Sequence, residues 1–588
     1  MRFLLWRERH ISEKATVLIL AVVVGALSGF AALLLKALIA FVANLLTAHV
    51  SITTGNYMYL LWPVLGILIT MLFVKYVVRD NISHGVTRVL RAISQNKSRL
   101  KPHNTWTSLL ASGITIGFGG SVGAEGPIVA TGAAIGSNLG SALRLSPRVL
   151  MIMVGCGAAA GIAGIFKAPI AGLLFTIEVL MLDLTAGSVM PLMLASISGA
   201  VVAYIFTGYD LEFFFSQSEP FTTSRIPYVI ILGVFCGFVS LYFTKVMNAM
   251  ETMLSRVHNR WVKLVIGGVI LSSLIFFFPP LYGEGYNTIN ILLRGDVSLI
   301  FDGSPFYPFH QSITFTALFI VLLMLSKVFA TSATNGCGGV GGTFAPSLFV
   351  GCMAGFFFAF LLNQIGITGG DLSTKNFALM GMAGVMSAVM HAPLMAIFLT
   401  AEMTGGYDLF LPLLIVSVIS YGTIRLFLPF SIYSMRLAQR GELLTHQKDR
   451  TVLTLLKLPS VIETDFTQVH PDMSLKQMVE AIAQSRRNVF PVTNRDTGRL
   501  LGVVYLDDIR NIMFRPDLYR KMTVERFMTS PPARIVTGMP MQAVMDTFDR
   551  TAAWYLPVVD GNRKYVGFVS KSRILLSYRQ VLKHFTDD

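Results

Sequence analysis

Charged side chains are scarce in this chain. Only 13% of its 588 residues are Asp, Glu, Lys or Arg, whereas 53% are hydrophobic. Soluble domains carry about 25% charged residues, so the composition excludes a wholly soluble protein. Residues 15–440 contain apolar runs such as ATVLILAVVVGALSGFAALLL (15–35), and about 20 such residues are enough to span a bilayer. We therefore expect a polytopic membrane domain over 15–440 and a soluble region after it.

Cysteine is also scarce. The chain has four cysteines, and their spacing fits neither a disulfide framework nor a zinc site; they are Cys156, Cys236, Cys337 and Cys352. We therefore expect no metal site and no required cofactor. The first apolar run is too long for a cleavable signal peptide, and no small-residue cleavage site is obvious.

Basic residues outnumber acidic ones and give a net charge of +15. Lys and Arg gather at the ends of apolar runs, as in RFLLWRER (2–9) and RLAQRGE (436–442). Excess basic residues mark cytoplasmic loops, which explains the charge better than a nucleic-acid partner. We therefore expect a cytoplasmic N-terminal segment over 1–14, both termini in the cytoplasm, and a multi-pass protein of the plasma (inner) membrane in contact with the lipid bilayer.

Two glycine-rich stretches of the membrane region are internally repeated. GFGGSVGAEGPIVATGAAIG (117–136) matches GCGGVGGTFAPSLFVGCMAG (336–355) at six glycines and one proline. GAAAGIAGIFKAPIAGLLFTIEV (157–179) then matches GMAGVMSAVMHAPLMAIFLTAEM (381–403) in the same order. We therefore expect duplicated units over about 105–210 and 325–435. Corresponding apolar segments interrupted by Gly and Pro are typical of transporter binding sites.

The repeated stretches predict helices that begin in the middle of the membrane. Such N-termini present free N–H groups and a partial positive charge, so they can bind an anion. Lys and Arg are absent from 102–143 and from 328–374, and we therefore expect an anion site without basic side chains. In an alternative interpretation, the glycines only let helices pack closely.

Glu125 is the only acidic residue in the first basic-free stretch. An ionisable group inside a membrane segment is a functional candidate. When deprotonated, Glu125 could occupy the anion site, and when protonated it could leave. The sequence therefore predicts a proton-operated gate, while the alternative is a carboxylate that only caps a helix.

Four motifs together resemble those of the CLC family of voltage-gated chloride channels and proton–chloride antiporters. They are NISHGVT (81–87), GAEGP (123–127), GGTFAP (341–346) and SIYSMRL (431–437). The resemblance implies an all-α membrane domain with an antiparallel (inverted) internal repeat and broken helices, assembled as a homodimer that transports chloride and, in the exchangers, protons. It further implies that Glu125 is the gate and that the anion-binding residues are His84, Gly85, Val86, Gly123, Ala124, Gly126, Thr343, Phe344, Ala345 and Tyr433.

Departures from the family motifs leave two choices open. Val179 stands where many exchangers have a proton-transfer glutamate, so a passive channel and a proton-coupled antiporter are both retained. Glu178 and its repeat mate Glu402 are expected to have structural roles. Ala124 replaces an arginine, Thr87 replaces a proline, and His84 replaces the serine that usually helps to hold chloride. Fluoride or nitrate is therefore an alternative to chloride.

The soluble region contains a second duplication. RRNVFPVTNRDTGRLLGVVYLDDIRNI (486–512) matches AAWYLPVVDGNRKYVGFVSKSRILLSY (552–578), and an amphipathic helix is expected before each. The pair resembles a CBS-domain pair, which implies an α/β cytoplasmic domain with a linker at 441–459 and copies at 460–516 and 524–583. By the same resemblance, Asp508 and Ser570 are candidates for binding an adenine nucleotide. A purely structural or dimerising tail is the alternative.

Two other classes of function are compatible with parts of the sequence. Gly119–Gly123 fits the G-x-S-x-G pattern of serine hydrolases, so Ser121 and His391 could form an intramembrane hydrolase. The repeat places Val340 opposite Ser121, however, so the duplicated unit does not need the hydroxyl, and we expect no enzymatic activity. A nucleotide sensor with a membrane anchor is the second rival, but broken helices are more than an anchor requires.

Overall fold

The structure is a computed structural model that divides into two compact units, Met1–Leu443 and Leu444–Asp588, each described here by itself. It describes residues 10, 12–47, 56–95, 98–182, 186–209, 211–213, 215, 221–366, 372–439, 458–551 and 553–577. The predicted cytoplasmic segment 1–14 and linker 441–459 therefore lie mostly outside the described residues.

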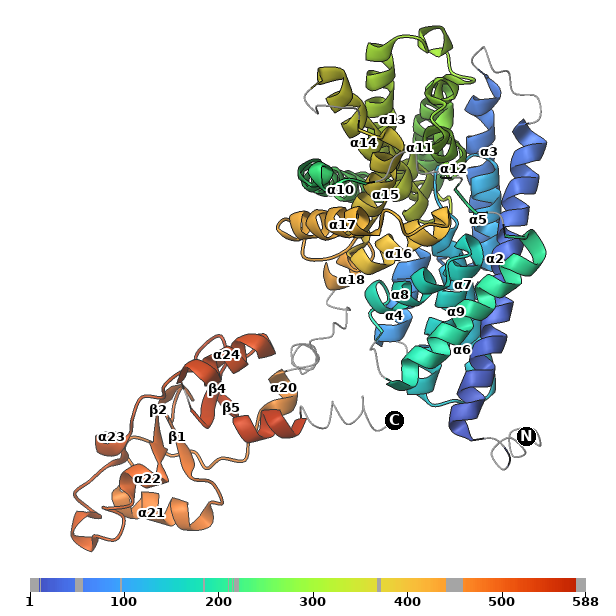
Figure 1. Cartoon of the computed structure of the whole chain (residues 1–588). Helices are drawn as coiled ribbons and strands as arrows, with labels where there is room; N and C mark the ends of the chain where they lie inside the picture. The colour runs from blue at the N-terminus through green and yellow to red at the C-terminus, as the bar shows by residue number, and fades with distance from the viewer. Residues whose placement is uncertain are drawn as a thin grey trace. The chain divides into compact units, whose positions relative to one another are not determined.

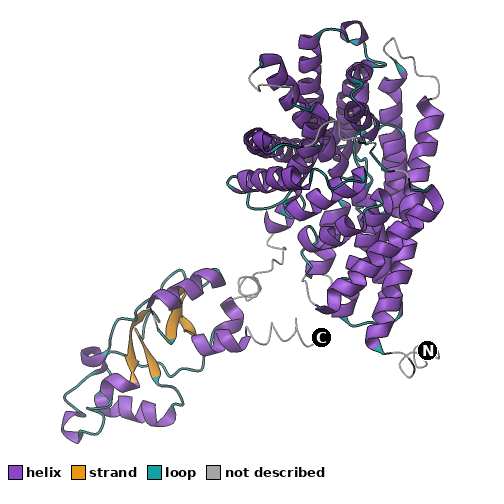
Figure 2. Cartoon of the chain, viewed as in Figure 1, coloured by secondary structure: helices purple, strands orange, loops and turns teal. Residues whose placement is uncertain are grey.

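The first unit is built from helices (Figures 1 and 2). Eight of its described helices are long and apolar enough to cross a membrane, which agrees with the expected polytopic domain. Their order is α2 (Glu13–Thr47), α3 (Met58–Phe73) continued by η1 (Val74–Val78), α4 (Gly85–Gln95), η2 (Pro102–Thr105), α5 (Thr107–Gly117), α6 (Glu125–Ala142), α7 (Pro147–Phe166), α8 (Pro169–Glu178), α9 (Ala186–Thr207), η3 (Thr223–Arg225), α10 (Ile226–Ser255), α11 (Arg260–Phe277), η4 (Pro279–Leu281), α12 (Tyr286–Arg294), η5 (Val297–Phe301), η6 (Tyr307–Phe309), α13 (Ile313–Gly336), α14 (Phe344–Ile365), α15 (Thr374–Met390), α16 (Pro393–Thr404), α17 (Phe410–Arg425) and α18 (Met435–Gln439).

The packing of the helices is duplicated as the sequence repeat predicts. Helix α6 packs on α7 and α7 on α9, and their counterparts α14, α15 and α17 pack on one another in the same way. Part of the glycine pattern serves this packing. A Cβ at Gly132 would collide with the backbone of Gly157, and one at the repeat mate Gly351 would collide with Gly381. The close-packing interpretation is therefore correct for these glycines.

Two glutamates show that the repeats are inverted. The carboxylate of Glu178, at the end of α8, accepts hydrogen bonds from the first turn of α16, from the amides of Leu394 (3.1 Å) and Met395 (2.7 Å). The carboxylate of Glu402, near the end of α16, accepts them from the first turn of α8. Each helix end lies at the other's start, so α8 and α16 run antiparallel. The structure confirms the predicted inverted repeat.

The helices before and after the glycine motifs are broken, as predicted. α5 ends at Gly117 and α6 begins at Glu125, while α13 ends at Gly336 and α14 begins at Phe344. The intervening loops are almost wholly buried in protein. Irregular backbone at membrane depth is stable only in such surroundings or beside a wet cavity.

The second unit contains two similar α/β halves. The first has α21 (Leu475–Gln484), β1 (Val489–Thr493), β2 (Leu500–Tyr505), α22 (Leu506–Ile509), η7 (Pro516–Leu518) and α23 (Val524–Phe527), and the second has β3 (Ile535–Val536), α24 (Met541–Thr551), β4 (Tyr555–Val559) and β5 (Tyr565–Ser570). Helix α20 (Leu458–Val461) comes first in sequence and packs in the core of the second half. The strands form one antiparallel pair, β1–β2, and one sheet in the order β3–β4–β5. Both hairpins shift register at matching places, after Val492 and after Val558. This agrees with the expected α/β pair.

Candidate functional site

The two glycine-rich loops meet at residues that are repeat mates. Gly123 donates a backbone hydrogen bond to the carbonyl of Gly342 (2.9 Å), and Gly342 donates one back (2.7 Å). The amide of Ser121 donates to the Thr334 hydroxyl at 3.2 Å. The amide of Val340, the repeat mate of Ser121, donates to the hydroxyl of Thr115, the repeat mate of Thr334, also at 3.2 Å. The reciprocal bonds replace those that the broken helices lack, so both helix starts are held at one place.

Glu125 is buried where the two loops meet, with 1% of its surface exposed. Its Oε1 atom accepts a hydrogen bond of 2.8 Å from the hydroxyl of Tyr286. A Cβ at Gly342 would lie 3.0 Å from Oε2, so the carboxylate lies beside this glycine. The backbone amides of Glu125 and Ala345, in the first turns of α6 and α14, also contact the carboxylate. The capping interpretation of Glu125 therefore stays beside the gate interpretation.

A small cavity lies next to Glu125. The cavity has a volume of about 30 Å³, and about 10–15 Å³ is enough to hold one water. The first residues of α4 and α6 contribute to its wall, together with residues just before α14 and α18. Of the ten predicted anion-binding residues, six line it: His84, Gly85, Val86, Gly126, Thr343 and Tyr433.

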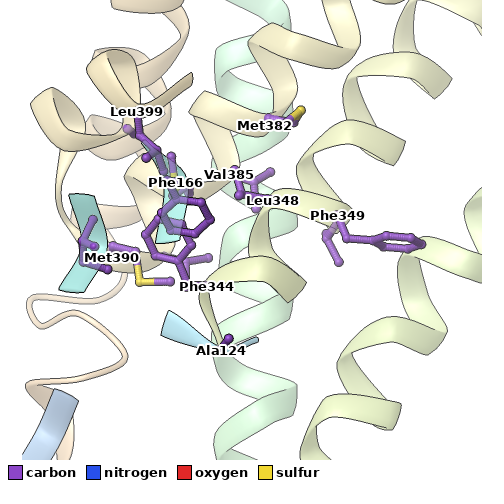
Figure 3. Close-up of a cluster of buried hydrophobic side chains, with 14 of the residues drawn as sticks. Ala124, Phe166, Phe344, Leu348, Phe349, Met382, Val385, Met390 and Leu399 are labelled. Atoms are coloured by element: carbon purple, nitrogen blue, oxygen red, sulfur yellow. The ribbon is translucent and has the colours of Figure 1, made fainter. Parts of the chain in front are cut away.

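The other four predicted residues lie outside the cavity lining. Gly123 forms the loop bridge, Ala124 donates its amide to Glu284, and Ala345 is in the first turn of α14. The ring of Phe344 is fully buried and stacks on Phe166 at a centroid distance of 5.4 Å, as Figure 3 shows.

Tyr433 joins three of the segments that line the cavity. Its hydroxyl accepts a hydrogen bond from Thr343 at 3.4 Å, and its carbonyl accepts one from Thr87 at 3.1 Å. Just before α4, His84 has a φ of 56°, a left-handed conformation that turns the chain into the helix. Four segments far apart in sequence thus direct helix N-termini toward one space, which suits an anion.

The expectation that no basic side chain lines the site is wrong. Arg436, on α18, lines the cavity and forms an ion pair with Glu251 of α10, which also lines it. The error arose because the absence of Lys and Arg was counted along the sequence, whereas Arg436 reaches the site from another helix.

A second basic residue is buried behind the loop. Lys327, on α13, has no exposed surface and donates hydrogen bonds to the Ser121 hydroxyl (2.9 Å) and the Gly283 carbonyl (3.0 Å). Next to Gly283, Glu284 accepts a hydrogen bond of 3.1 Å from the amide of Ala124. Sequence reasoning missed both residues. The available signals were a lone Lys directly after the apolar run 313–326, which is Lys327, and a lone acid in GEGY (283–286), which is Glu284.

The hydrolase interpretation is not supported by the geometry. The Ser121 hydroxyl is fully buried, donates to the carbonyl of Leu281 (2.7 Å) and accepts from Lys327. His391 follows α15, and its ring lies 5.6 Å from that of Tyr421. Ser121 thus has Lys327 as its side-chain neighbour and serves as a structural link.

The two nucleotide candidates occupy corresponding places after β2 and β5. Asp508 is exposed on α22, and its charge together with burial raises the pKa of Tyr505, the counterpart of Ser570. Ser570 is buried and donates a hydrogen bond of 2.6 Å to Glu463, which pairs with Arg487 at 3.0 Å. Asp508 is therefore open to a ligand, whereas Ser570 is already engaged.

An inverted repeat with broken helices that converge on a buried cavity defines a membrane transport protein. Residues 66–425 match the family described as voltage gated chloride channel, and residues 460–515 and 524–579 match the CBS domain. The chain belongs to this CLC family of chloride transport proteins and carries a C-terminal CBS pair.

Individual relatives agree with this assignment. The chain is 27% identical over 388 residues to a ClcB-like chloride channel protein of Ralstonia nicotianae, covering 65% of this chain and 86% of the relative. It is 30% identical over 337 residues to the voltage-gated ClC-type chloride channel ClcB of Escherichia coli O17:K52:H18, covering 56% and 75%.

Solved structures share the fold. A slow cyanobacterial Cl−/H+ antiporter aligns with a TM-score of 0.62 at 20% identity, over 72% of this chain and 97% of that one. A CLC-type fluoride/proton antiporter aligns with a TM-score of 0.57 at 24% identity, over 71% and 96%. A eukaryotic CLC transporter aligns with a TM-score of 0.59 at 17% identity, over 95% and 97%.

Proposed function

We propose that chloride crosses the membrane through the cavity beside Glu125 and that protonation of Glu125 opens this path. The observation that carries the proposal is the position of the Glu125 carboxylate, which is buried where two helix N-termini meet and one residue from Gly126 in the cavity wall. A deprotonated carboxylate there occupies the place that suits an anion. A protonated one loses that attraction and can leave.

The anion is held mainly by backbone amides and hydroxyl groups in this proposal. The amides come from the starts of three helices: α4 with His84, Gly85 and Val86, α6 with Gly123, Ala124 and Gly126, and α14 with Thr343, Phe344 and Ala345. Tyr433 offers its hydroxyl. The pairing of Arg436 with Glu251 moderates the positive charge that Arg436 brings to the cavity. Moderate binding favours conduction, because a permeating ion must also leave.

Proton-coupled exchange is the second candidate. A Cl−/H+ antiporter and a fluoride/proton antiporter share the fold, and the buried Glu125 can carry a proton as well as gate. Against coupling, the position of the inner proton-transfer glutamate is filled by Val179, which is buried. We favour a passive channel, with exchange, or transport of fluoride or nitrate, as the alternative outcomes of the test.

The test uses purified full-length protein in liposomes with an imposed chloride gradient. Chloride and proton movements are recorded together for the wild type and for Glu125→Gln. Chloride efflux without proton movement, with a pH dependence that the variant lacks, supports the gated channel. Proton uptake against its gradient that the variant lacks establishes exchange. Wild-type pH dependence in Glu125→Gln overturns the gate.

The assembly and surroundings complete the proposal. The protein is a homodimer in the plasma (inner) membrane with both termini in the cytoplasm. The orientation is supported by basic residues where α10 is followed by α11, namely Arg256 before α11 and Arg260 and Lys263 in its first turn. Its CBS pair binds an adenine nucleotide at Asp508, with no cofactor required for transport.

A further inference from the structure

Fully buried charged side chains are rare in this fold. Among the residues that the structure describes, Glu125 and Lys327 are the two charged residues that are buried, with 1% and 0% of their surface exposed. An unpaired buried charge is unstable, because its lost hydration must be replaced. Lys327 donates its hydrogen bonds to neutral oxygens of Ser121 and Gly283. Its charge must therefore be balanced by carboxylates farther away, and these are Glu284 and Glu125.

A short loop before α12 connects these charges. The carbonyl of Gly283 accepts from Lys327, the carboxylate of Glu284 accepts from the amide of Ala124, and the hydroxyl of Tyr286 donates to Glu125. We call residues 283–286 the tether loop. It binds the side chain of Glu125 and the backbone amide of Ala124, so a movement of the Glu125 carboxylate breaks its hydrogen bond to Tyr286.

We propose that Glu284 and Lys327 are positioning residues for the Glu125 gate: through the tether loop and their opposite charges they set the pH at which Glu125 takes up a proton and leaves its buried position. The proposal rests on the proposed function of Glu125. Neither residue lines the cavity, so each acts through Glu125.

Several charged and titratable groups surround Glu125 and Glu284. Lys327 of α13 and Tyr286 of α12 face Glu125, and Tyr433 feels its charge. Glu284 is also influenced by Lys36 of α2 and by Glu212, which are paired with each other at 2.5 Å. Because that pair is neutral as a whole, the balance at Glu125 depends on the negative charge of Glu284 and the positive charge of Lys327.

Opposite changes in charge give opposite expected results. Glu284→Gln removes a negative neighbour, so proton uptake by Glu125 becomes less favourable and the midpoint of the chloride efflux–pH profile moves to lower pH. Lys327→Met removes a positive neighbour, and the midpoint moves to higher pH. We expect shifts of about one pH unit in each direction. A merely structural contribution would reduce the amount of folded protein or the flux without shifting the midpoints in opposite directions.

The same variants are then made in the Glu125→Gln background. There neither should change the pH profile, because the group through which they act is absent. If Glu125→Gln alone keeps the wild-type profile, the proposed gate itself fails. If it abolishes pH dependence but Glu284→Gln and Lys327→Met leave the midpoint unchanged, or move it in one direction, only the present inference is overturned.

Matched controls separate charge from folding. Glu284→Asp keeps the charge, and its midpoint should stay within a few tenths of a pH unit of wild type. Glu402→Gln alters another membrane carboxylate, one that caps α8, and should not shift the midpoint. All variants are compared as full-length protein that elutes as a single species. If Lys327→Met does not yield such protein, the midpoints of the efflux–pH profiles of Glu284→Gln and Glu284→Asp are compared. Equal midpoints in these two variants overturn the inference.

Discussion

The hydroxyl of Tyr286 donates a hydrogen bond of 2.8 Å to Oε1 of Glu125, across 161 residues of sequence. It is a side-chain hydrogen bond to the carboxylate of the proposed gate, to which the backbone amides of Glu125 and Ala345 also contribute. A donor of this kind stabilises the deprotonated carboxylate. In the proposed mechanism, Tyr286 therefore favours the closed state of the path.

Replacing Tyr286 by Phe should make the gate open more readily. Hydrogen bonds to charged groups contribute about 1.5–3 kcal/mol, so losing this one should raise chloride efflux at neutral pH by roughly tenfold or more in liposomes. Tyr282→Phe is the matched control, because that hydroxyl donates to the carbonyl of Gly117 at 2.9 Å. Equal efflux in Tyr286→Phe and wild type would show that the bond does not hold the gate.

Two glycines of the second repeated motif should respond differently to alanine. A Cβ at Gly342 would lie 2.9 Å from the amide nitrogen of Gly126 and 3.0 Å from the Glu125 carboxylate, so Gly342→Ala should displace the start of α6 with its carboxylate and weaken the pH dependence of efflux. A Cβ at Gly351 would lie 2.8 Å from Cα of Met382, so Gly351→Ala should separate α14 from α15 and lower the yield of folded protein. A wild-type pH profile in Gly342→Ala would contradict the proposed packing of the gate.

The sequence predicts what is determined locally or by the repeat. The breaks before α6 and α14 follow from Gly and Pro placed next to the affected residues, and the inverted repeat follows from two matches in the same order. The burial of Lys327 could not be predicted in this way, because its partners Ser121 and Gly283 lie 206 and 44 residues away. Arg436 differs from Lys327, because it lies three residues after Tyr433 in the motif SIYSMRL, outside the two stretches in which basic residues were counted.

The reciprocal caps of α8 and α16 should contribute equally to stability. Glu178→Ala and Glu402→Ala each remove a carboxylate that accepts two backbone amides. Loss of a helix cap costs about 0.5–2 kcal/mol, so each variant should lower the Tm of the detergent-solubilised protein by a few degrees at a fixed scan rate. A Tm loss in only one variant would show that the repeats are not energetically equivalent.

Nucleotide binding at the CBS pair should depend on Asp508 more than on Ser570. Asp508 is exposed, whereas the Ser570 hydroxyl donates to Glu463, a carboxylate that would repel a phosphate. Millimolar ATP or AMP should therefore raise the Tm of the full-length protein by selective binding to the folded state.

Asp508→Ala should abolish that shift, and Ser570→Ala should retain it. Asp507→Ala is the matched control, because Asp507 pairs with Arg510 at 2.5 Å on the surface and is not expected to bind the nucleotide. If neither nucleotide changes the Tm of the wild type, the CBS pair has a purely structural role. If Ser570→Ala abolishes the shift and Asp508→Ala does not, the site lies in the second copy and Glu463 must turn away from it to admit the ligand.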